Sequence, residues 1–452
     1  MLIFCLTCFA LSMGATAQLP ISTLDGTVTD PQGAVVAGAT VVITNTATGM
    51  SREATTGSDG GFAVTDLSPG QYTVRVNAPG FATSEFRELR LEVGRASTLN
   101  VSLKIIGAGE VIQVTTGDIA VNSTQSEVQG VMEAAAIESL PLNGRNFLDL
   151  AFLIPGNRPA ARFDPTKTNT VEVSSAGAFG RGGNIIVDGT DNNDEVVGGT
   201  LMNFPQDGLA EFQIAVNKYT AEVGRSSSSI INIATKSGSN DVHGSEYIFF
   251  RHKALQGLPA TFDRRLPTPR FSREQFGGSL GGPFVRDKLF GFISMEYLDQ
   301  DHAVPVGVRD FTTNTVTGGS ALAFVHDFRL TSKGDWIPDE KDHISLRYSF
   351  ERSLDVDNGF LTQPAGSAAN RQQSLNRYNS VLANWTRSLS ARQINTVIYQ
   401  KNYFLNSIPG FSPNDPVTNP AGLAPGNEVR FPSLQDGANY RIPQRTIEHC
   451  II

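Results

Sequence analysis

The residues from His343 to Glu351 read H-I-S-L-R-Y-S-F-E, and apolar and polar side chains alternate strictly along them. Successive side chains of a β-strand point to opposite faces, so this segment forms a strand with one apolar and one charged face. The same period of two occurs at 288–298 and at 321–333. A tilted strand needs about 10 residues to cross a bilayer. The pattern therefore predicts long amphipathic strands rather than short, wholly buried ones.

The spacing of the strands distinguishes a membrane barrel from an extended soluble β-domain. Alternation and turn residues place seven strands, at 243–253, 272–284, 288–300, 321–333, 342–352, 374–388 and 392–405. Long links at 254–271, 301–320, 353–373 and 406–440 alternate with short links at 285–287, 334–341 and 389–391. Outer-membrane barrels have short turns on one side and long loops on the other. The rhythm favours a membrane barrel, and an extended soluble β-domain is the alternative.

Composition agrees with a mostly β, exported protein. The 452 residues include 44 Gly and 23 Pro, and only 18% are charged, which suits many turns and disfavours a helical or a charged disordered chain. The net charge of -8 and the lack of a basic stripe argue against a nucleic-acid partner. After the N-terminus no run of 18 apolar residues occurs, so no membrane-spanning helix is expected.

The first 17 residues are predicted to be a secretory signal peptide. They form an apolar stretch that ends in Ala15-Thr16-Ala17, an A-x-A cleavage site before Gln18. The first basic residue is Arg52, so the usual positive segment is missing and the true start is expected upstream. Removal of this segment would leave Cys450 as the single thiol, which excludes an internal disulfide.

Residues 18–105 are predicted to form a separate β-sandwich. Short β-rich runs such as 39–43 and 72–76 are separated by dense turn signals, among them Asp30-Pro31-Gln32-Gly33 and Ser58-Asp59-Gly60-Gly61. The string G-x-V-x-D-x-x-G-x-x-V-x-G-A-x-V from Gly26, followed by L-x-P-G-x-Y-x-V from Leu67, resembles the carboxypeptidase regulatory-like domain. That resemblance implies a noncatalytic, prealbumin-like sandwich in a carbohydrate-binding-like fold class.

The middle of the chain carries an ordered set of motifs. They are LPLNGRNF at 140–147, VDG at 187–189, YTAEVGR at 219–225, INIATKSG at 231–238, HGS at 243–245 and QFGGSLGGP at 275–283. In this order they resemble the plug and first barrel strands of the Oar-like TonB-dependent receptors. The resemblance implies a 22-stranded outer-membrane barrel closed by a plug, with energy delivered by TonB. We expect an α+β plug domain with its TonB box at 106–238 and a partial barrel at 239–452.

The number of strands departs from that family. About seven strands fit before Ile452, and the ending T-I-E-H-C-I-I is neither an alternating strand nor an aromatic-terminated one. An unclosed sheet would expose backbone polar groups to lipid. The sequence therefore predicts a fragment, truncated within the barrel.

One short segment between the sandwich and the plug resembles a TonB box, the strand that pairs with TonB. The candidate residues are Glu110, Val111, Ile112, Gln113, Val114, Thr115 and Thr116. Such a box would act by strand addition, in which an extended segment pairs its main chain with a partner strand. The alternative is a last strand of the sandwich or a simple linker.

Three apparent catalytic or metal signals in the sequence do not form a coherent site. His243 and Glu246 match H-x-x-E, but positions three apart on a strand point to opposite faces and cannot share a zinc ion. The acidic run that begins at Asp188 lacks the spacing of a calcium loop, and Asp-Gly favours a hairpin turn. The serines at 226–229 lack a nucleophile elbow. The chain is expected to be no enzyme and to use no cofactor or metal.

The sequence thus predicts the N-terminal part of an outer-membrane TonB-dependent receptor for energised uptake of an unknown solute, with carbohydrate as one class. The expected partners are TonB and outer-membrane lipid, and the N-terminal domain is expected in the periplasm. The alternative is a cell-surface glycan-binding or adhesion protein that uses the sandwich. Arg145 and Arg225 are expected in a buried charge network between plug and barrel.

Overall fold

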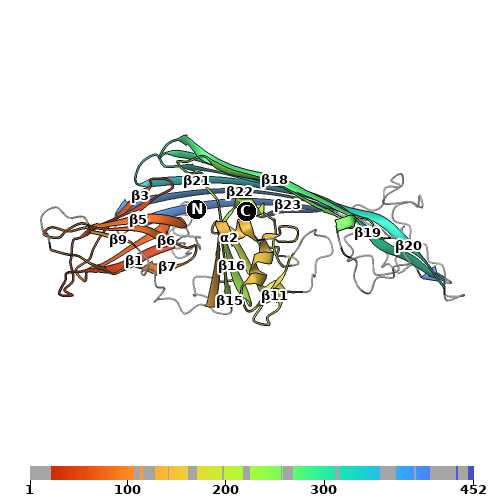
Figure 1. Ribbon diagram of the computed structural model, residues 1–452, viewed down its shortest axis with the longest axis horizontal. Helices are drawn as coiled ribbons and strands as arrows, with labels where there is room; N and C mark the ends of the chain where they lie inside the picture. The colour runs from red at the N-terminus through yellow and green to blue at the C-terminus, as the bar shows by residue number, and fades with distance from the viewer. Residues whose placement is uncertain are drawn as a thin grey trace, which may run out of the picture.

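The computed structural model describes residues 22–105, 112–115, 128–140, 142–160, 171–195, 198–216, 224–255, 257, 268–310, 315–356, 373–390, 393–407, 434–435 and 446–451. The predicted signal peptide lies outside them. The chain is mostly β, as predicted. It forms an N-terminal sandwich, a middle domain and one large curved sheet (Figure 1).

The sandwich consists of two sheets. The first contains β1 (Ser22–Thr29), β4 (Gly61–Leu67), β7 (Ala96–Thr98) and β8 (Val101–Ser102). The second has the strand order β3-β2-β5-β6-β9. Its strands are β2 (Thr40–Asn45), β3 (Ser51–Thr55), β5 (Gly70–Asn77), β6 (Ser84–Leu91) and β9 (Ile112–Thr115).

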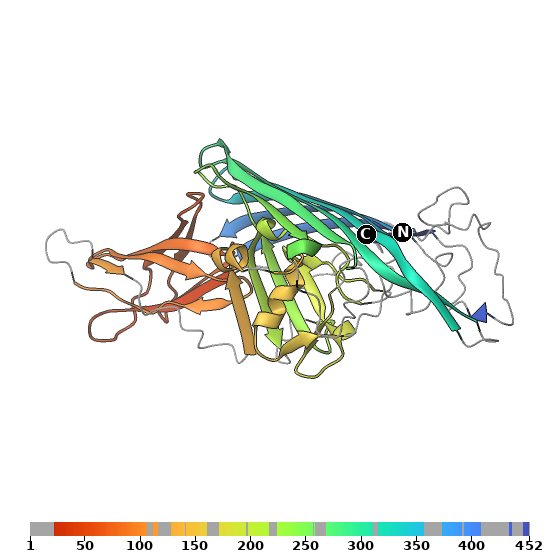
Figure 2. The ribbon, with the colours of Figure 1, turned by 45° about the vertical axis from the view of Figure 1, so that its right-hand side comes forward.

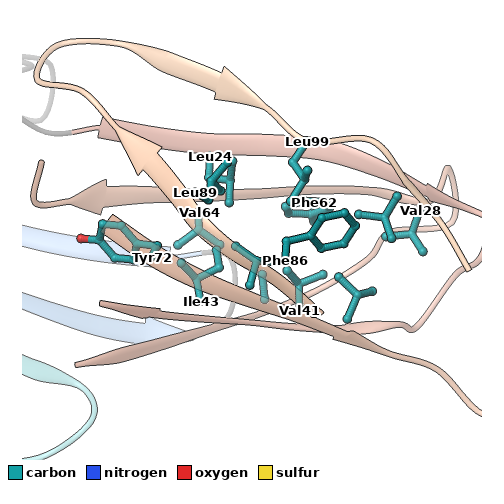
Figure 3. Packing of buried hydrophobic residues seen from close by; sticks show 14 of the residues in the cluster. Leu24, Val28, Val41, Ile43, Phe62, Val64, Tyr72, Phe86, Leu89 and Leu99 are labelled. Atoms are coloured by element: carbon teal, nitrogen blue, oxygen red, sulfur yellow. The ribbon is translucent and has the colours of Figure 1, made fainter. Parts of the chain in front are cut away.

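Alternation along the strands builds the core of the sandwich. In β2 every second side chain is buried, and Val41 and Ile43 are fully enclosed. They meet Leu24 and Val28 from the opposite sheet, together with the rings of Phe62 and other residues (Figure 3). This cluster lies between residues 24 and 103. Burial of each large apolar side chain contributes about 1.5–3 kcal/mol.

The middle domain is built on a five-stranded sheet with the order β10-β15-β16-β13-β14. These strands are β10 (Val128–Glu133), β13 (Asn184–Val187), β14 (Thr190–Asp191), β15 (Leu209–Val216) and β16 (Ser229–Thr235). A small hairpin is formed by β11 (Asn157–Pro159) and β12 (Val173–Ser175). The short helices are α2 (Ala134–Ser139), η1 (Phe147–Leu153), η2 (Gly180–Gly182) and η3 (Gln206–Gly208).

Among the described residues, the large sheet contains nine strands, of which eight run in the order β17-β18-β19-β20-β21-β22-β23-β25, while β24 pairs with β19. Their bounds are β17 (His243–His252), β18 (Phe271–Val285), β19 (Leu289–Asp310), β20 (Thr315–Trp336), β21 (Asp342–Val356), β22 (Gln373–Ser390), β23 (Gln393–Ser407), β24 (Leu434–Gln435) and β25 (Thr446–Ile451). A short helix, η4 (Lys253–Leu255), follows β17. Each predicted strand is present, and β19 and β20 extend well beyond the expected bounds.

Two predictions about the large sheet were wrong. The segment 301–320 is no long link, because β19 and β20 continue their pairing from Leu289↔Trp336 up to Asp310↔Thr315. The chain end is also a strand, since β25 pairs with β23 from Ser407↔Thr446 to Asn402↔Ile451. An exposed strand edge offers main-chain partners to a segment that lacks an alternating pattern of its own.

The two faces of the large sheet differ as the alternation predicts. On β21, Arg347 and Glu351 are 1% exposed, whereas Leu346 is 55% and Tyr348 is 39% exposed. The middle domain lies against the polar face, and the sandwich lies beside one end of the strands (Figures 1 and 2). Among the described residues, no helix is long and apolar enough to cross a membrane.

Candidate functional site

The described part of the TonB-box candidate is strand β9, and it lies on the sandwich. Ile112–Thr115 pairs in parallel with β6, from Ser84↔Ile112 to Arg87↔Thr115. It is the outer strand of its sheet, with no described strand on its far side. Glu110, Val111 and Thr116 lie outside the described residues. In the structure, Ile112–Thr115 thus lies where a last strand of the sandwich would lie, which is the alternative interpretation of this segment.

The sandwich contacts the middle domain through a buried carboxylate. Glu211 of β15 accepts a hydrogen bond from the backbone N–H of Val93 at 2.7 Å and one from Arg90 at 3.0 Å. Arg90 also pairs with Glu133 at 2.9 Å. Burial raises the pKa of the Glu211 carboxyl to about 7, although both of its hydrogen-bond donors oppose that shift. This contact therefore changes its charge near neutral pH.

The loop that makes this contact contains a glycine with a positive φ, and it lies close to side chains of the middle domain. Gly94 has a φ of +66°, and a Cβ added there would lie 2.5 Å from Oε1 of Gln213 and 3.1 Å from Nδ2 of Asn232. A side chain at this position would be strained and would also collide with the middle domain. The loop after β6 is therefore shaped to lie directly on β15 and β16.

The middle domain is fixed to the large sheet by Arg145. Its Nε donates to Oε2 of Glu296 on β19 at 3.1 Å, and its Nη2 bonds Asp207 of η3. The guanidinium also lies over the ring of Tyr247, 4.1 Å from its centroid, and the Tyr247 hydroxyl donates to Glu296 at 2.5 Å. All three charged groups are at least nine-tenths buried. The expected buried charge network is present at Arg145, between the middle domain and the large sheet.

The polar face of the large sheet extends this network. Arg329 of β20 donates to Glu296 at 3.0 Å and to Asp327 at 2.6 Å. Glu351 of β21 accepts two hydrogen bonds from Asn203 of the middle domain, from its backbone N–H at 2.7 Å and its side chain at 2.9 Å. Removing one member of such a buried set leaves the others uncompensated. The contact is thus specific in its register.

A second anchor lies at the turn between β13 and β14. Asp188 and Gly189 form this turn with φ of 47° and 78°, which confirms the predicted hairpin turn. The Asp188 carboxylate accepts from Arg347 of β21 at 2.5 Å and from the Thr235 hydroxyl at 2.6 Å, and Lys333 lies 3.9 Å away. Burial alone would raise the pKa of Asp188, but the two cations and the Thr235 hydrogen bonds lower it to about 2.

Arg225 does not take part in either anchor. It pairs with Asp191 at 3.2 Å and with Glu195, both within the middle domain, and its side chain is 55% exposed. The expectation that it reaches the barrel was wrong. The sequence predicts a cation near the large sheet. It does not distinguish an ion pair within the middle domain from an ion pair between two domains.

The sandwich also touches the turns at the end of the large sheet. The backbone N–H of Asn240 donates to the Ala47 carbonyl at 2.9 Å, and Arg52 bonds the Ser388 hydroxyl. A cavity of about 380 Å³ lies where the three parts meet, bordered among others by Tyr72 and Lys333. Polar contacts from Ala47 and Arg52 therefore join the sandwich to this end of the large sheet.

The metal and catalytic signals find no site in the described part of the chain. His243 stacks on Phe292 with 6.4 Å between ring centroids, and its Nδ1 lies near Ser239 and the Asp241 carbonyl. No group of three or more His, Cys, Asp or Glu residues among those described is placed to hold a metal ion.

Two parts of the chain match known protein families. Residues 23–104 match the carboxypeptidase regulatory-like domain, and residues 234–321 match the outer membrane beta barrel domain. Over 345 residues the chain is 30% identical to the TonB-dependent transporter Oar of Myxococcus xanthus, covering 73% of this chain and 30% of that protein. The chain thus spans less than a third of the length of this relative.

Solved structures of lower similarity were also found. The outer membrane transporter YddB from Escherichia coli has a TM-score of 0.49 at 13% identity, covering 62% of this chain and 39% of that chain. The siderophore receptor PirA from Acinetobacter baumannii has a TM-score of 0.47 at 15% identity, covering 71% and 43%.

The sequence matches define an outer-membrane protein of the TonB-dependent receptor class that carries a carboxypeptidase regulatory-like domain. Within this class the chain is a homologue of the Oar transporter. The recognition made from the ordered motifs is confirmed. By its name this relative is a transporter.

Proposed function

We propose that this chain is part of an outer-membrane receptor that imports a solute with energy delivered through TonB. In this proposal the sandwich stands in the periplasm, the middle domain is the plug and the large sheet is part of the barrel wall. The observation that carries it is the placement of the middle domain on the polar face of strands whose other face is apolar. A soluble pair of domains would leave that apolar face exposed to water.

The plug assignment is supported by the two buried anchors. Arg145 and Asp188 each join the middle domain to charged groups on the inward face of β19, β20 and β21. Buried ion pairs of this kind add little net stability but strongly penalise any other register. Such contacts suit a domain that must seat in one position in the wall.

The assignment of TonB as partner is supported by the place of β9. The strand lies between the sandwich and β10, so a pull on it would be transmitted along the chain into the middle domain. Strand addition needs an extended segment with available main-chain groups. Ile112–Thr115 is extended and lies at a sheet edge.

A glycan-binding role for the sandwich has no comparable support. Exposed aromatic rings are a common platform for sugars, but Phe62, Tyr72 and Phe86 are at most 6% exposed, and Phe81 packs partly against the core. These are the four aromatic residues between 22 and 105. We therefore place the solute site in the plug and barrel of the receptor rather than in its sandwich domain.

Two measurements test the proposal. The full-length protein should fractionate with outer membranes and resist extraction by high salt, and a soluble periplasmic protein would contradict the barrel. A purified TonB periplasmic domain should capture the receptor, and Val114→Pro should abolish capture because proline removes a main-chain donor from the strand. Ser58→Pro is the matched control, since Ser58 occupies the second position of the turn closed by Gly57 and Gly60, where proline is tolerated.

A further inference from the structure

We propose that the edge of β6 is a holding site for the TonB-box strand, and that β9 must leave β6 before it pairs with TonB. The inference rests on the proposed function. It adds a role for the sandwich, which keeps the box extended but occupied until TonB competes for it. The observation that carries it is the parallel pairing of β9 with β6 over Ile112–Thr115.

The matched domain and the described core of the sandwich both end before β9 begins. The match to the carboxypeptidase regulatory-like domain ends at residue 104, and the buried cluster lies between residues 24 and 103. β9 is thus a strand added to the outer edge of a finished domain. Its departure would uncover the edge of β6 but would leave the described core intact.

The pairing is also of the weaker kind. It joins four positions, in parallel, whereas β5 pairs with β2 over six positions from Thr40↔Asn77 to Asn45↔Tyr72. Parallel pairs are slightly less stable per residue than antiparallel ones. A partner strand that offers more main-chain hydrogen bonds would therefore displace β6 as the pairing partner of β9.

The contacts described between the sandwich and the other two parts come from segments outside β9. Val93 and Arg90 bind Glu211 of the middle domain, and Ala47 binds Asn240 beside the large sheet. The sandwich can therefore stay docked while β9 moves. Six residues separate Ile105 from β9, and twelve separate β9 from β10. Twelve extended residues reach at most about 40 Å, so the strand has room to depart.

A strand has two edges, so a second geometry must be tested against this one. TonB could add to the free edge of β9 while β9 remains on β6. The two geometries differ in one respect that can be measured. Release requires the β6–β9 pairing to break, and addition in place does not.

The test locks the pairing with a disulfide. Arg87 and Thr115 face each other across β6 and β9, and neighbouring strands lie about 4.8 Å apart, within the Cα range that a disulfide spans. The variant is the full receptor with Arg87→Cys, Thr115→Cys and Cys450→Ser, and bond formation is verified by mass spectrometry. A matched control, Val42→Cys with Glu53→Cys, locks β2 to β3 at a facing pair far from the box.

The expected result is at least about tenfold weaker capture of the TonB periplasmic domain by the oxidised Arg87–Thr115 variant, restored by reductant. The β2–β3 lock and each single cysteine should bind equally well in both redox states. Equal capture by the oxidised and reduced Arg87–Thr115 variant would overturn the inference in favour of addition in place. Val114→Pro distinguishes the two proposals: if it retains full capture, the box lies elsewhere and the proposed partner segment fails as well.

Discussion

Arg145 of the middle domain donates from Nε to Oε2 of Glu296 on β19 at 3.1 Å, across 151 positions of sequence. Both side chains are nearly fully buried. Each therefore depends on the other to compensate for the loss of water. The pair fixes where the middle domain sits on the wall.

Replacing Arg145 should loosen the middle domain. Arg145→Ala leaves Asp207 and Glu296 with one cation fewer in a buried site, and breaking such a pair costs about 3–5 kcal/mol. The measurement is the unfolding midpoint of the middle domain in the detergent-solubilised receptor. Arg225→Ala is the control, because that exposed arginine should contribute about 1 kcal/mol or less. Equal midpoints for the two variants would contradict the anchor.

The second anchor predicts a response to acid. The folded pKa of Asp188 is about 2, below its ordinary value of 3.8, so its contribution is present above pH 3.8 and is lost as the pH falls through about 2. The shift corresponds to about 2 kcal/mol. Asp188→Asn keeps a residue that tolerates the positive φ of the turn but removes the charge. The free energy of unfolding of this variant should depend less on pH between 3.8 and about 2 than that of the wild-type protein. An unchanged dependence would exclude the ion pair with Arg347 as the cause of the acid response.

Docking of the sandwich should weaken as the pH rises. The folded pKa of Glu211 is raised to about 7 from 4.5, so the docked state holds a proton that the free state loses. The stabilisation is complete below pH 4.5 and declines up to about pH 7, by about 3 kcal/mol at most. Energy transfer between labels on the sandwich and the middle domain, followed in urea at pH 5.5 and pH 8, measures it. Glu211→Gln should dock almost equally at both values, and a wild-type protein insensitive to pH would refute the prediction.

The strands of the large sheet were predictable from the sequence because a single local property, the alternation of apolar and polar side chains, determines them. Strict alternation, as in Ile344, Leu346 and Tyr348, assigns each side chain to a face, and the turns between strands set the ends. The same pattern placed Glu296, Arg329 and Glu351 on the polar face. It could not name their partners, because periodicity gives a direction within one strand and no information about a residue 151 positions away.

The prediction failed where tertiary context decides. β25 has no alternating pattern, and the edge of β23 supplies its partner. The box candidate was correctly recognised as a β-prone segment, but its pairing with β6 depends on an edge that exists only in the folded sandwich. Glu211 gave only a weak signal, because an acid within an apolar strand has no local feature that reveals a contact with Val93. A charged residue flanked by Ala210 and Phe212 was the one available hint.

Disulfide trapping in living cells tests the central claim most directly, because it needs no knowledge of the solute. Single cysteines at each position from Glu110 to Thr116 would be combined with a cysteine in TonB. Strand pairing predicts crosslinks whose yield alternates with a period of two along the segment and disappears with Val114→Pro. Absence of crosslinks, or equal yields that persist in the proline variant, would show that this segment does not pair with TonB.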